Sequence, residues 1–476
     1  MSNYKKILNN TIAMTIGQFS SKVLSFLLLP LYTSFLSTNE YGTYDIIVTT
    51  VTLLTPFLTM VISEGVLRFC LDNKYKNTEV FTIGIMVLMG SSTLLLFLAP
   101  IFLKFEAIRE YYYWFLTFFI VMNLHTVLTQ YLKGCGKVKQ YSIMGVISTA
   151  TTLLFNILFL AVFRWGIVGY MSATIISHLS ISVIIILKNR LWHEWINPLH
   201  IERSIYCDIF KYCIPMIPNS ISWWISDSSD KYLLLYFLSS VEVGIYSMAY
   251  KIPSMLTIFM SLFISAFQIS IFEKFGSKQS YELFENVYRI ILSIITVGAT
   301  ILIFSSKYLA YILYQNEFYE AWKVGCILIV AFIFNSLSSV VGTFYTASKN
   351  TKYLFYSTVL AAVINISLNI VLIPLFDMYG AAIATLISYM SVWFFRIMKT
   401  QKIAKFNLMD GSSIIVFLLI ILQVILEIID SLYIVPVSLG IVFIVFILCV
   451  RELRKTDIVE IVQNKLKDKF KIKNSN

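Results

Sequence analysis

Apolar runs long enough to cross a membrane recur along almost the whole chain, and only roughly 25 residues at the C-terminus lack one. A helix needs about 20 residues to cross the hydrocarbon layer, and it satisfies its own backbone polar groups there. The runs do not alternate apolar and polar residues, as the strands of a membrane barrel would. The composition agrees, with 58% hydrophobic and 13% charged residues. We therefore expect an all-α integral membrane protein.

The number and order of these runs predict about fourteen membrane spans. If the N-terminus is cytoplasmic, most of the 37 Lys and Arg residues fall on the cytoplasmic side, as the positive-inside rule requires. The net charge of +11 then reflects topology and contact with the lipid bilayer, and we expect no nucleic-acid partner. The cations expected on the outer side are Lys104, Arg109, Arg164, Lys307 and Lys323. The expected spans are residues 11–35, 44–66, 80–103, 112–132, 141–163, 166–187, 212–238, 244–269, 288–305, 324–346, 353–375, 380–398, 411–429 and 432–450.

Two short motifs occur twice in the chain, in the same order and at almost the same separation. FLSTNEYGTY at 35–44 matches FLSSVEVGIY at 237–246 at six of ten positions, with the Glu, Gly and Tyr in register. GYMSATIIS at 169–177 likewise matches GAAIATLIS at 380–388. These repeats predict two six-helix halves. Because six is even, both halves enter the membrane from the same side, so we expect parallel repeats with a substrate site at their interface.

The repeats also divide the chain into domains. In each half, the first motif is expected to end one helix, make a tight turn outside the membrane through Gly42 or Gly244, and start the next helix. The last segment carries apolar residues among lysines, a pattern typical of a helix lying on the membrane surface. The predicted domains are 1–190 (N-terminal half), 191–211 (cytoplasmic linker), 212–400 (C-terminal half), 401–450 (two extra transmembrane helices) and 451–476 (basic cytoplasmic tail).

Three stretches resemble the bacterial polysaccharide repeat-unit flippases of the multidrug/oligosaccharidyl-lipid/polysaccharide exporter superfamily. They are KVLSFLLLPLYTSFLSTNEYGTYD at 22–45, YLKGCGKVKQYS at 131–142 and PMIPNSISWWISDSSDKYLLLYFLSSVEVGIYSMAYKIP at 215–253. The resemblance covers essentially all of residues 1–400. It implies two six-helix bundles that form a V around a central cavity and open alternately to the two sides of the membrane.

The resemblance also implies a cargo and a cellular setting. Members of the family move an undecaprenyl-pyrophosphate-linked oligosaccharide from the inner to the outer leaflet of the bacterial cytoplasmic membrane, for O-antigen, capsule or exopolysaccharide assembly. We expect a multi-pass protein with both termini in the cytoplasm, working beside the polysaccharide polymerase machinery. No cofactor is expected beyond H+ or Na+ as a coupling ion.

Two lysines lie inside predicted spans with no carboxylate three or four residues away. Lys22 is in the middle of the first span, and Lys251 is a turn or two into the eighth. A charged group is costly in the membrane, so each lysine must find water, another helix or a ligand. Both are candidate substrate-binding residues for a diphosphate. Lys251 is also near enough to the outer surface for its long side chain to reach it.

The seventh predicted span carries three charged residues. Asp227 and Lys231 are four apart, so they share a helix face and are expected to form an ion pair, in which Lys231 is also a candidate cation for the substrate. Asp230 lacks a partner at that spacing. A buried carboxylate without a partner could exchange a proton, which makes Asp230 the candidate for ion coupling, with Asp227 beside it. The adjacent residues Asp230 and Lys231, in SSDKYLL, also resemble the Asp-Arg/Lys of the flippase family.

The second and seventh spans add further candidates. Glu64 and Arg68 are four apart and predict a structural ion pair, with Glu64 as a second coupling candidate and Arg68 facing the leaflet where a lipid diphosphate would arrive. Trp223 and Trp224 lie in the seventh span beside its charged residues, and indole rings there could stack on sugar rings.

The cysteines and the remaining cationic clusters are not expected to form a functional site. The six cysteines include no CxxC and lie near no histidine cluster, so neither disulfides nor a metal site is expected. Two cationic clusters are attributed to topology and headgroup contact, and they are Lys133/Lys137/Lys139 and Arg396/Lys399/Lys402/Lys405.

Three alternative functions use different chemistry. An ion-coupled exporter of drugs or metabolites could share the fold, although cationic drugs would favour a more acidic cavity than these lysines provide. A membrane-embedded polymerase or glycosyltransferase would need a large outer loop or paired carboxylates, and no nucleotide-binding glycine loop or Ser/His/Asp set is evident, so we expect no enzyme. A channel would need a symmetric ring of selective ligands, which two dissimilar halves do not offer.

Overall fold

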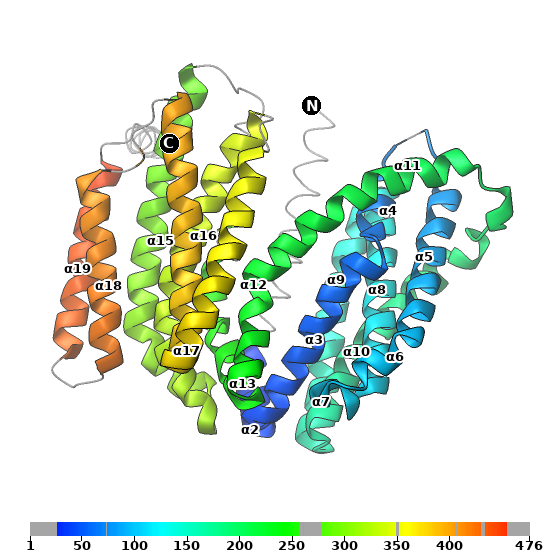
Figure 1. Cartoon of the computed structure of the whole chain (residues 1–476), viewed down its shortest axis with the longest axis horizontal. Coiled ribbons are helices and arrows are strands. Elements are labelled where there is room, and N and C mark those ends of the chain that lie inside the picture. The colour runs from blue at the N-terminus through cyan, green and yellow to red at the C-terminus, as the bar shows by residue number, and fades with distance from the viewer. Residues whose placement is uncertain are drawn as a thin grey trace, which may run out of the picture. The chain divides into compact units, whose positions relative to one another are not determined.

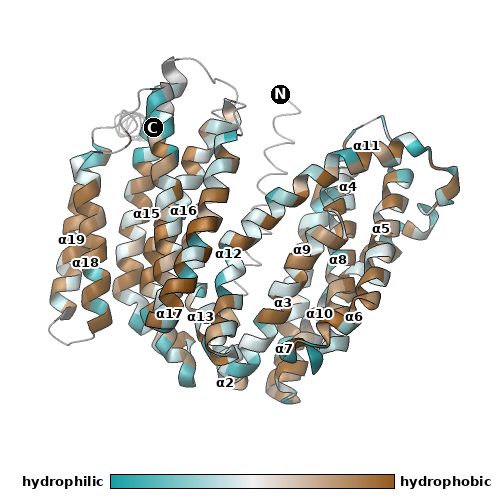
Figure 2. Cartoon of the chain, in the orientation of Figure 1, coloured by the Kyte–Doolittle hydropathy of each residue, from teal (hydrophilic) through white to brown (hydrophobic). Residues whose placement is uncertain are grey.

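All regular secondary structure in the described part of the chain is helical (Figure 1). The computed structural model describes residues 26–72, 74–257, 260, 264, 278–348, 352–404, 408, 410–429 and 434–454. Hydrophobic residues make up most of several of these helices, as Figure 2 shows for α5, α18 and α19. The predicted all-α membrane fold is confirmed.

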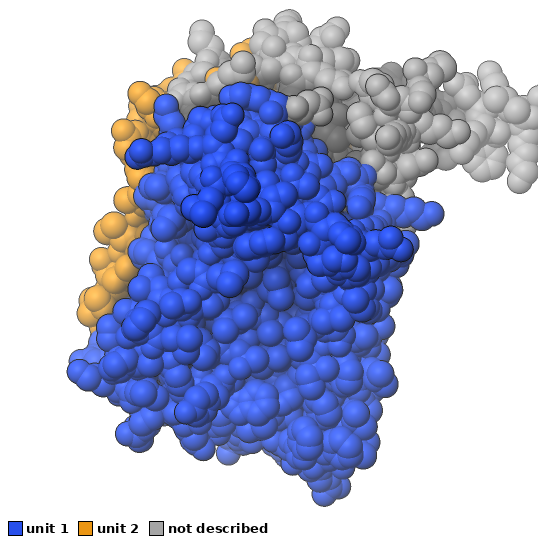
Figure 3. Space-filling model, turned by 90° about the vertical axis from the view of Figure 1, so that its right-hand side faces the viewer, with its two compact units in different colours: residues 1–247, 313–318 blue, residues 248–312, 319–476 orange. Residues whose placement is uncertain are grey.

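The chain divides into two compact units, and each is described by itself. Unit 1 comprises residues 1–247 and 313–318, and unit 2 comprises residues 248–312 and 319–476 (Figure 3). The division into halves at residues 190 and 212 stays a prediction. The longer helices of unit 1 are α2 (Leu29–Phe35), α3 (Thr38–Leu58), α4 (Ile62–Cys70), α5 (Asn77–Phe97), α8 (Tyr112–Gly134), α9 (Val138–Asn156), α10 (Gly166–Asn189), α11 (Arg203–Cys213), α12 (Ile217–Phe237) and α13 (Ser240–Ala249), whose end belongs to unit 2. The short ones are α6 (Ala99–Phe102), α7 (Glu106–Arg109), η1 (Ile157–Val162), η2 (Leu191–His193), η3 (Pro198–His200) and η4 (Ile214–Met216).

One predicted span of unit 1 is sharply bent. Helices α3 and α4 together form a span with a 58° break between them. Pro56 cannot donate the helical hydrogen bond of its turn, and Met60 and Val61 then adopt φ values of 52° and 57°. Such left-handed backbone is uncommon outside glycine, so the surrounding packing must hold it in place. The break turns α4, with Glu64 and Arg68, away from the line of α3.

Unit 2 is organised around a helix that is buried on nearly every side. In the stretch of α16 that is apolar enough to cross a membrane, 89% of the residues are buried. This is the pattern of a helix at the centre of a bundle. The long helix α17 is broken at Asp377, where φ is 50° and ψ is −134°, so it holds the two predicted spans 353–375 and 380–398. The helices of unit 2 are α15 (Lys278–Leu313), α16 (Ala321–Ala347), α17 (Lys352–Ala404), α18 (Gly411–Ile429) and α19 (Ile434–Leu453), while η5 (Asn316–Glu320) lies at the boundary, with residues 316–318 in unit 1.

The described residues contain nine helices that are long and apolar enough to cross a membrane, or ten if the bent pair α3–α4 counts as one span. Helix α12 is not among them because it carries three charged residues, Asp227, Asp230 and Lys231. The segments 11–25 and 265–269 of the first and eighth predicted spans lie outside the described residues. The expected total of fourteen spans stays a prediction.

Arg396 corrects one expectation about the cationic clusters. Its side chain is only 3% exposed, so it does not contact lipid headgroups. Its guanidinium donates hydrogen bonds from Nε to the Ser357 hydroxyl (2.9 Å) and from Nη1 to the Ser338 carbonyl (2.8 Å). Hydrogen bonds of this kind are what make a buried cation tolerable. Within unit 2, Arg396 therefore joins α17 to α16, while Lys405 of the same predicted cluster lies outside the described residues.

A polar network fixes the start of α18 in unit 2. Asp410 accepts hydrogen bonds from the Ser413 amide (3.0 Å) and from Arg289 Nη1 (3.1 Å). Arg289 also contacts Glu285 (3.1 Å) and Glu452 (3.2 Å). Asp410 thus caps the helix and shares a guanidinium that also contacts α19. Partial burial alone would raise the pKa of Asp410, but hydrogen bonds from Ser413 and Ser412 outweigh it and hold the pKa well below its usual range.

Replacing Asp410 with alanine should therefore lower the free energy of unfolding by about 1–2 kcal/mol at pH 7, the usual cost of losing an N-cap. Because the carboxylate has a depressed pKa in the folded state, it stabilises the fold above the unfolded-state value of about 3.9. That stabilisation is lost as the pH falls further. Thermal unfolding in detergent should show a gap between the two proteins at pH 7 that narrows at pH 3. An equal melting temperature at pH 7 would contradict the capping role.

Candidate functional site

The two copies of the first repeated motif begin with matching helix caps. Ser37 and Glu40 form a reciprocal capping box at the start of α3. At the start of α13, the Ser239 hydroxyl donates to Glu242 (2.5 Å) and accepts from the Val241 amide (3.1 Å). The repeated Ser and Glu are therefore helix-start signals, and the chain turns just before them.

The predicted role of the repeated glycines as turn residues is wrong. Gly42 and Gly244 lie inside α3 and α13, where they allow the two helices to touch. A Cβ atom on Gly42 would lie 1.8 Å from the Ser240 carbonyl oxygen, and one on Gly244 would lie 2.0 Å from the Thr38 carbonyl oxygen. Real Cβ atoms do not approach oxygen so closely, so the contact requires glycine on both sides. The two copies of the motif therefore pack directly on each other within unit 1.

A buried ion pair lies one turn along from this contact. Lys231 Nζ of α12 is 2.6 Å from Asp45 Oδ2 of α3, and the two side chains are only 16% and 13% exposed. The Ser247 hydroxyl of α13 donates to the same Asp45 oxygen (2.7 Å). Asp45 and Ser247 follow the two motif copies at equivalent positions, so the repeat places both groups together. The pair joins three helices through charges that would be costly in lipid if separated.

Asp230 also has a partner, which corrects the expectation that it would lack one. Its side chain is 1% exposed, and the Tyr246 hydroxyl of α13 donates to its Oδ2 (2.6 Å). Its Oδ1 accepts from the Lys231 amide (3.0 Å). The partner was not visible at helical spacing because it comes from a different helix. The carboxylate remains an ionisable group deep in unit 1, beside the Asp45–Lys231 pair.

The two adjacent tryptophans of α12 have different surroundings. Trp224 donates from Nε1 to the Thr49 carbonyl (3.1 Å) and to the Thr52 hydroxyl (3.2 Å) of α3. Trp223 is 43% exposed. Two turns further on, Tyr232 shares a 2.5 Å hydrogen bond with Thr50. Trp224 therefore fixes α12 on α3, and Trp223 is the indole available to a ligand.

Four tyrosines form a cluster near the motif contact that the sequence alone did not reveal. Tyr44 and Tyr170 have ring centroids 4.0 Å apart, and Tyr32 lies 4.5 Å from Tyr170. Tyr41 stacks on Tyr170 at 6.0 Å. These rings come from α2, α3 and α10, and no spacing within one helix would have predicted their meeting. One of them, Tyr44, directly precedes Asp45 in the chain.

The expected Glu64–Arg68 ion pair is wrong. Among the described residues, no contact within ion-pair distance joins the two side chains. Glu64 instead accepts a hydrogen bond from Gln130 Nε2 of α8 (3.0 Å), while Arg68 is exposed. A partner on a neighbouring helix thus replaces the partner on the same helix, and Arg68 keeps its charge at the surface of unit 1.

Two histidines of unit 1 were not among the candidates predicted from the sequence. His125 of α8 and His178 of α10 have ring centroids 4.6 Å apart. The Nδ1 atom of each is buried and has no hydrogen-bond partner among the described residues. An ionisable group inside a membrane span is a functional candidate by default, so this pair is a second polar candidate in unit 1.

The other predicted site residues do not lie together in the described part of the chain. Lys22 lies outside the described residues. Lys251 is half-buried and belongs to unit 2, and Asp227 is exposed on α12. No three His, Cys, Asp or Glu side chains lie close enough to hold a metal ion in the part of the chain that the structure describes. The candidate site of unit 1 is therefore the group Asp45, Lys231, Asp230, Tyr246 and Ser247, which we call the α3–α12 cluster.

Family comparison assigns the chain to a known group of proteins. The family described as polysaccharide biosynthesis protein matches residues 7–275, more than half of the chain. The chain belongs to this family. A second family, MatE, matches residues 215–371, which include all of α12 and α16 and the first part of α17.

Individual relatives agree with the family. The probable low-salt glycan biosynthesis flippase Agl15 of Haloferax volcanii is 26% identical over 185 residues, which are 38% of this chain and 39% of that protein. The lipid II flippase MurJ, in an inward closed conformation, has a TM-score of 0.68 at 15% identity and covers 94% of this chain and 100% of its own. An inward-facing multidrug resistance MATE transporter of the MOP superfamily has a TM-score of 0.66 at 14% identity, covering 81% and 94%. The chain therefore has the MOP fold.

Proposed function

We propose that this polysaccharide biosynthesis protein is a flippase for lipid-linked oligosaccharides. Its cargo would be an undecaprenyl-pyrophosphate-linked repeat unit, moved from the inner to the outer leaflet of a bacterial cytoplasmic membrane by alternating access. The observation that carries the proposal is the family match over residues 7–275. The flippase relative and the MOP fold support it. O-antigen, capsule and exopolysaccharide assembly are the pathways that consume such a product, through a polymerase on the outer side.

The geometry supports a coupling role for the α3–α12 cluster. Lys231 is already neutralised by Asp45, so it can bind a diphosphate only if that ion pair opens. Asp230 lies beside it and can take up H+, and the carboxylates together could hold Na+. Ion binding at these carboxylates would change the charge balance that holds α12 on α3. We propose that this change drives the cycle, with Lys22, Lys251 and Arg68 as the cations for the diphosphate and Trp223 as a sugar-stacking residue.

Complementation tests this function. The parent chain, Lys22→Ala, Lys251→Ala and Asp230→Asn should be expressed at matched levels in a bacterium that lacks its own repeat-unit flippase. We expect the parent to restore surface polysaccharide, and each variant to reduce it at least tenfold with lipid-linked repeat units accumulating in the inner leaflet. Lys76→Ala changes a cation whose side chain is 81% exposed, and it should export like the parent. Failure of the parent with several repeat-unit structures would reject the proposal.

The MatE match over residues 215–371 favours one alternative, an ion-coupled exporter of small molecules with the same fold. The same strains discriminate between the two functions. Increased resistance to cationic drugs, driven by a proton or sodium gradient and unaccompanied by polysaccharide export, would establish the exporter. Polysaccharide export without a change in drug resistance would establish the flippase.

A further inference from the structure

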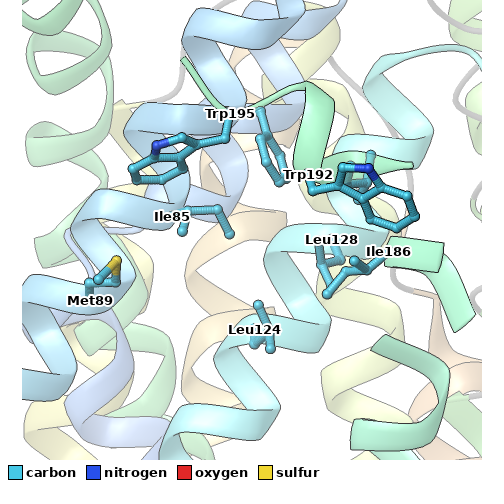
Figure 4. A pocket seen from close by; sticks show the side chains of 9 residues that line it. Ile85, Met89, Leu124, Leu128, Ile186, Trp192 and Trp195 are labelled. Carbon is cyan, nitrogen blue, oxygen red and sulfur yellow. The ribbon is translucent and has the colours of Figure 1, made fainter. Parts of the chain in front are cut away.

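Unit 1 contains an apolar groove that the proposed transport cycle does not use. It has a volume of about 540 Å³ and lies where α5 begins and where α8 and α10 end (Figure 4). This volume is within the usual range for a small-ligand site. Every side chain that lines it is apolar or aromatic, and these are Phe81, Ile85, Met89, Leu124, Leu128, Ile186, Leu191, Trp192 and Trp195.

The helix pattern explains why the groove is continuous. Phe81, Ile85 and Met89 are each four residues apart, so they form one stripe over two turns of α5. Leu124 and Leu128 form a matching stripe on α8. Figure 4 shows Ile85 and Met89 on one side of the groove, and Leu124 and Leu128 on the other. The groove therefore runs along the helices, in the direction that a lipid chain takes in a membrane.

The segment after α10 closes one end of the groove and is firmly held. The Ile196 amide donates to the Thr82 hydroxyl of α5 (3.2 Å), and the Tyr206 hydroxyl donates to the Pro198 carbonyl (3.2 Å). Trp192 and Trp195 of this segment are 51% and 41% exposed. Tryptophan prefers the boundary between hydrocarbon and headgroups. The two indoles therefore mark the level at which a lipid headgroup would sit.

Three cations lie at the C-terminal end of α10 or contact it, next to the segment that closes the groove. Lys188 and Arg190 are exposed and lie within three residues of Leu191, and Lys137 Nζ donates to Asn189 Oδ1 (2.8 Å). None of the three cations forms an ion pair with a described residue. Glu194 is the one carboxylate in the closing segment 190–196, so the rim carries a positive excess. Basic pockets beside transmembrane helices are typical binding sites for anionic lipid headgroups.

We propose that this groove binds one acyl chain of an anionic phospholipid, with the lipid phosphate on Lys188, Arg190 and Lys137. The apolar stripes bind the chain, and the exposed cations select the charge of the headgroup. The groove is open along its side, so a lipid can enter from the surrounding leaflet without passing through the bundle. A resident phospholipid is favoured over the lipid carrier of the cargo, because the site has a single short groove and the membrane holds its own lipids in large excess.

Photolabelling of the full chain in vesicles tests this site. The probe is phosphatidylglycerol with a diazirine in one acyl chain, and phosphatidylcholine with the same chain is the reference. We expect adducts to concentrate on α5 and α8 at the groove. Lys188→Gln and Arg190→Gln should each reduce phosphatidylglycerol labelling about fivefold, the factor that corresponds to about 1 kcal/mol per surface cation. Labelling by phosphatidylcholine should not change.

A matched pair of variants separates the groove from general lipid contact. Leu124 lines the groove and is only partly buried, so Leu124→Trp fills the groove and should reduce labelling by both probes at least fivefold. Leu154→Trp adds the same bulk on α9, where the side chain is 61% exposed and away from the groove, and should label like the parent. If Leu124→Trp fails to fold, the two cation variants test the site instead, because they change only exposed residues.

Three results would overturn the assignment. Equal labelling by the two probes would remove the headgroup selectivity, and adducts spread evenly over exposed helices would remove the groove. Displacement of the phosphatidylglycerol probe by an equimolar polyprenyl phosphate would assign the groove to the cargo carrier instead. Because labelling needs no transport, the result is independent of the complementation test, and either proposal can fail alone.

Discussion

Replacing Lys231 with alanine should lower the free energy of unfolding in detergent by about 3–5 kcal/mol, the cost of breaking a buried ion pair. The change leaves the Asp45 carboxylate without the ammonium group 2.6 Å away, in a place where both side chains are nearly buried. Ser247 donates one hydrogen bond to Asp45, which cannot replace a full charge. Thermal unfolding monitored by intrinsic fluorescence measures the loss.

The double variant Asp45→Leu/Lys231→Met provides the decisive comparison. Removing both charges leaves no unpaired ion, so the double variant should recover more than half of the stability lost by Lys231→Ala. Lys76→Ala is the control, because its pair with Glu79 has a cation that is 81% exposed and a distance of 3.8 Å. Such a pair contributes about 1 kcal/mol or less. A Lys231→Ala protein as stable as Lys76→Ala would show that the buried pair does not hold α12 on α3.

The same double variant separates stability from transport. If the Asp45–Lys231 pair only holds the helices together, the double variant should be stable and should export polysaccharide in the complementation assay. If the pair opens and closes during the cycle, the double variant should be stable and inactive, because neutral side chains cannot respond to ion binding at Asp230. Activity and stability measured on one protein therefore distinguish a structural pair from a coupling pair.

The helices were predictable because each depends on the hydropathy of its own stretch of sequence. The predicted spans 112–132 and 166–187 agree closely with α8 (Tyr112–Gly134) and α10 (Gly166–Asn189). Each is an apolar run bounded by polar or turn-forming residues, so hydropathy alone determines it. The break between α3 and α4 was harder to predict, because Pro56 marks only a weak point in α3 and the left-handed backbone at Met60 and Val61 depends on the packing around them.

The site was only partly predictable because its contacts join different helices. Lys231 and Asp230 stood out as charges inside a span, but their partners Asp45 and Tyr246 come from α3 and α13. Helical spacing within α12 cannot identify either partner. One signal was present, since Asp45 and Ser247 occupy equivalent positions just after the two motif copies. Extending the repeat by one residue would have placed both among the candidates.

Replacing Gly42 or Gly244 with alanine should lower the free energy of unfolding by about 3 kcal/mol or more, at the upper end of the overpacking range. The new methyl group would meet a backbone carbonyl of the facing helix, at Ser240 or at Thr38, and a backbone cannot rotate away as a side chain can. The two helices must separate, which also disturbs the hydrogen bonds from Tyr246 and Ser247 to the α3–α12 cluster.

Gly90 supplies a control at which the same substitution should raise the stability instead of lowering it. It lies inside α5 with no atom within 4 Å of an added Cβ, so Gly90→Ala adds only helix propensity and should stabilise the protein by about 0.5–1 kcal/mol. Melting temperatures that fall for Gly42→Ala and Gly244→Ala but rise for Gly90→Ala would show that close helix contact is why the two motif copies keep their glycines. A rise for all three would mean that these glycines only weaken their helices. The two motif copies would then not meet in the folded protein, and the cluster that depends on their contact would need a different origin.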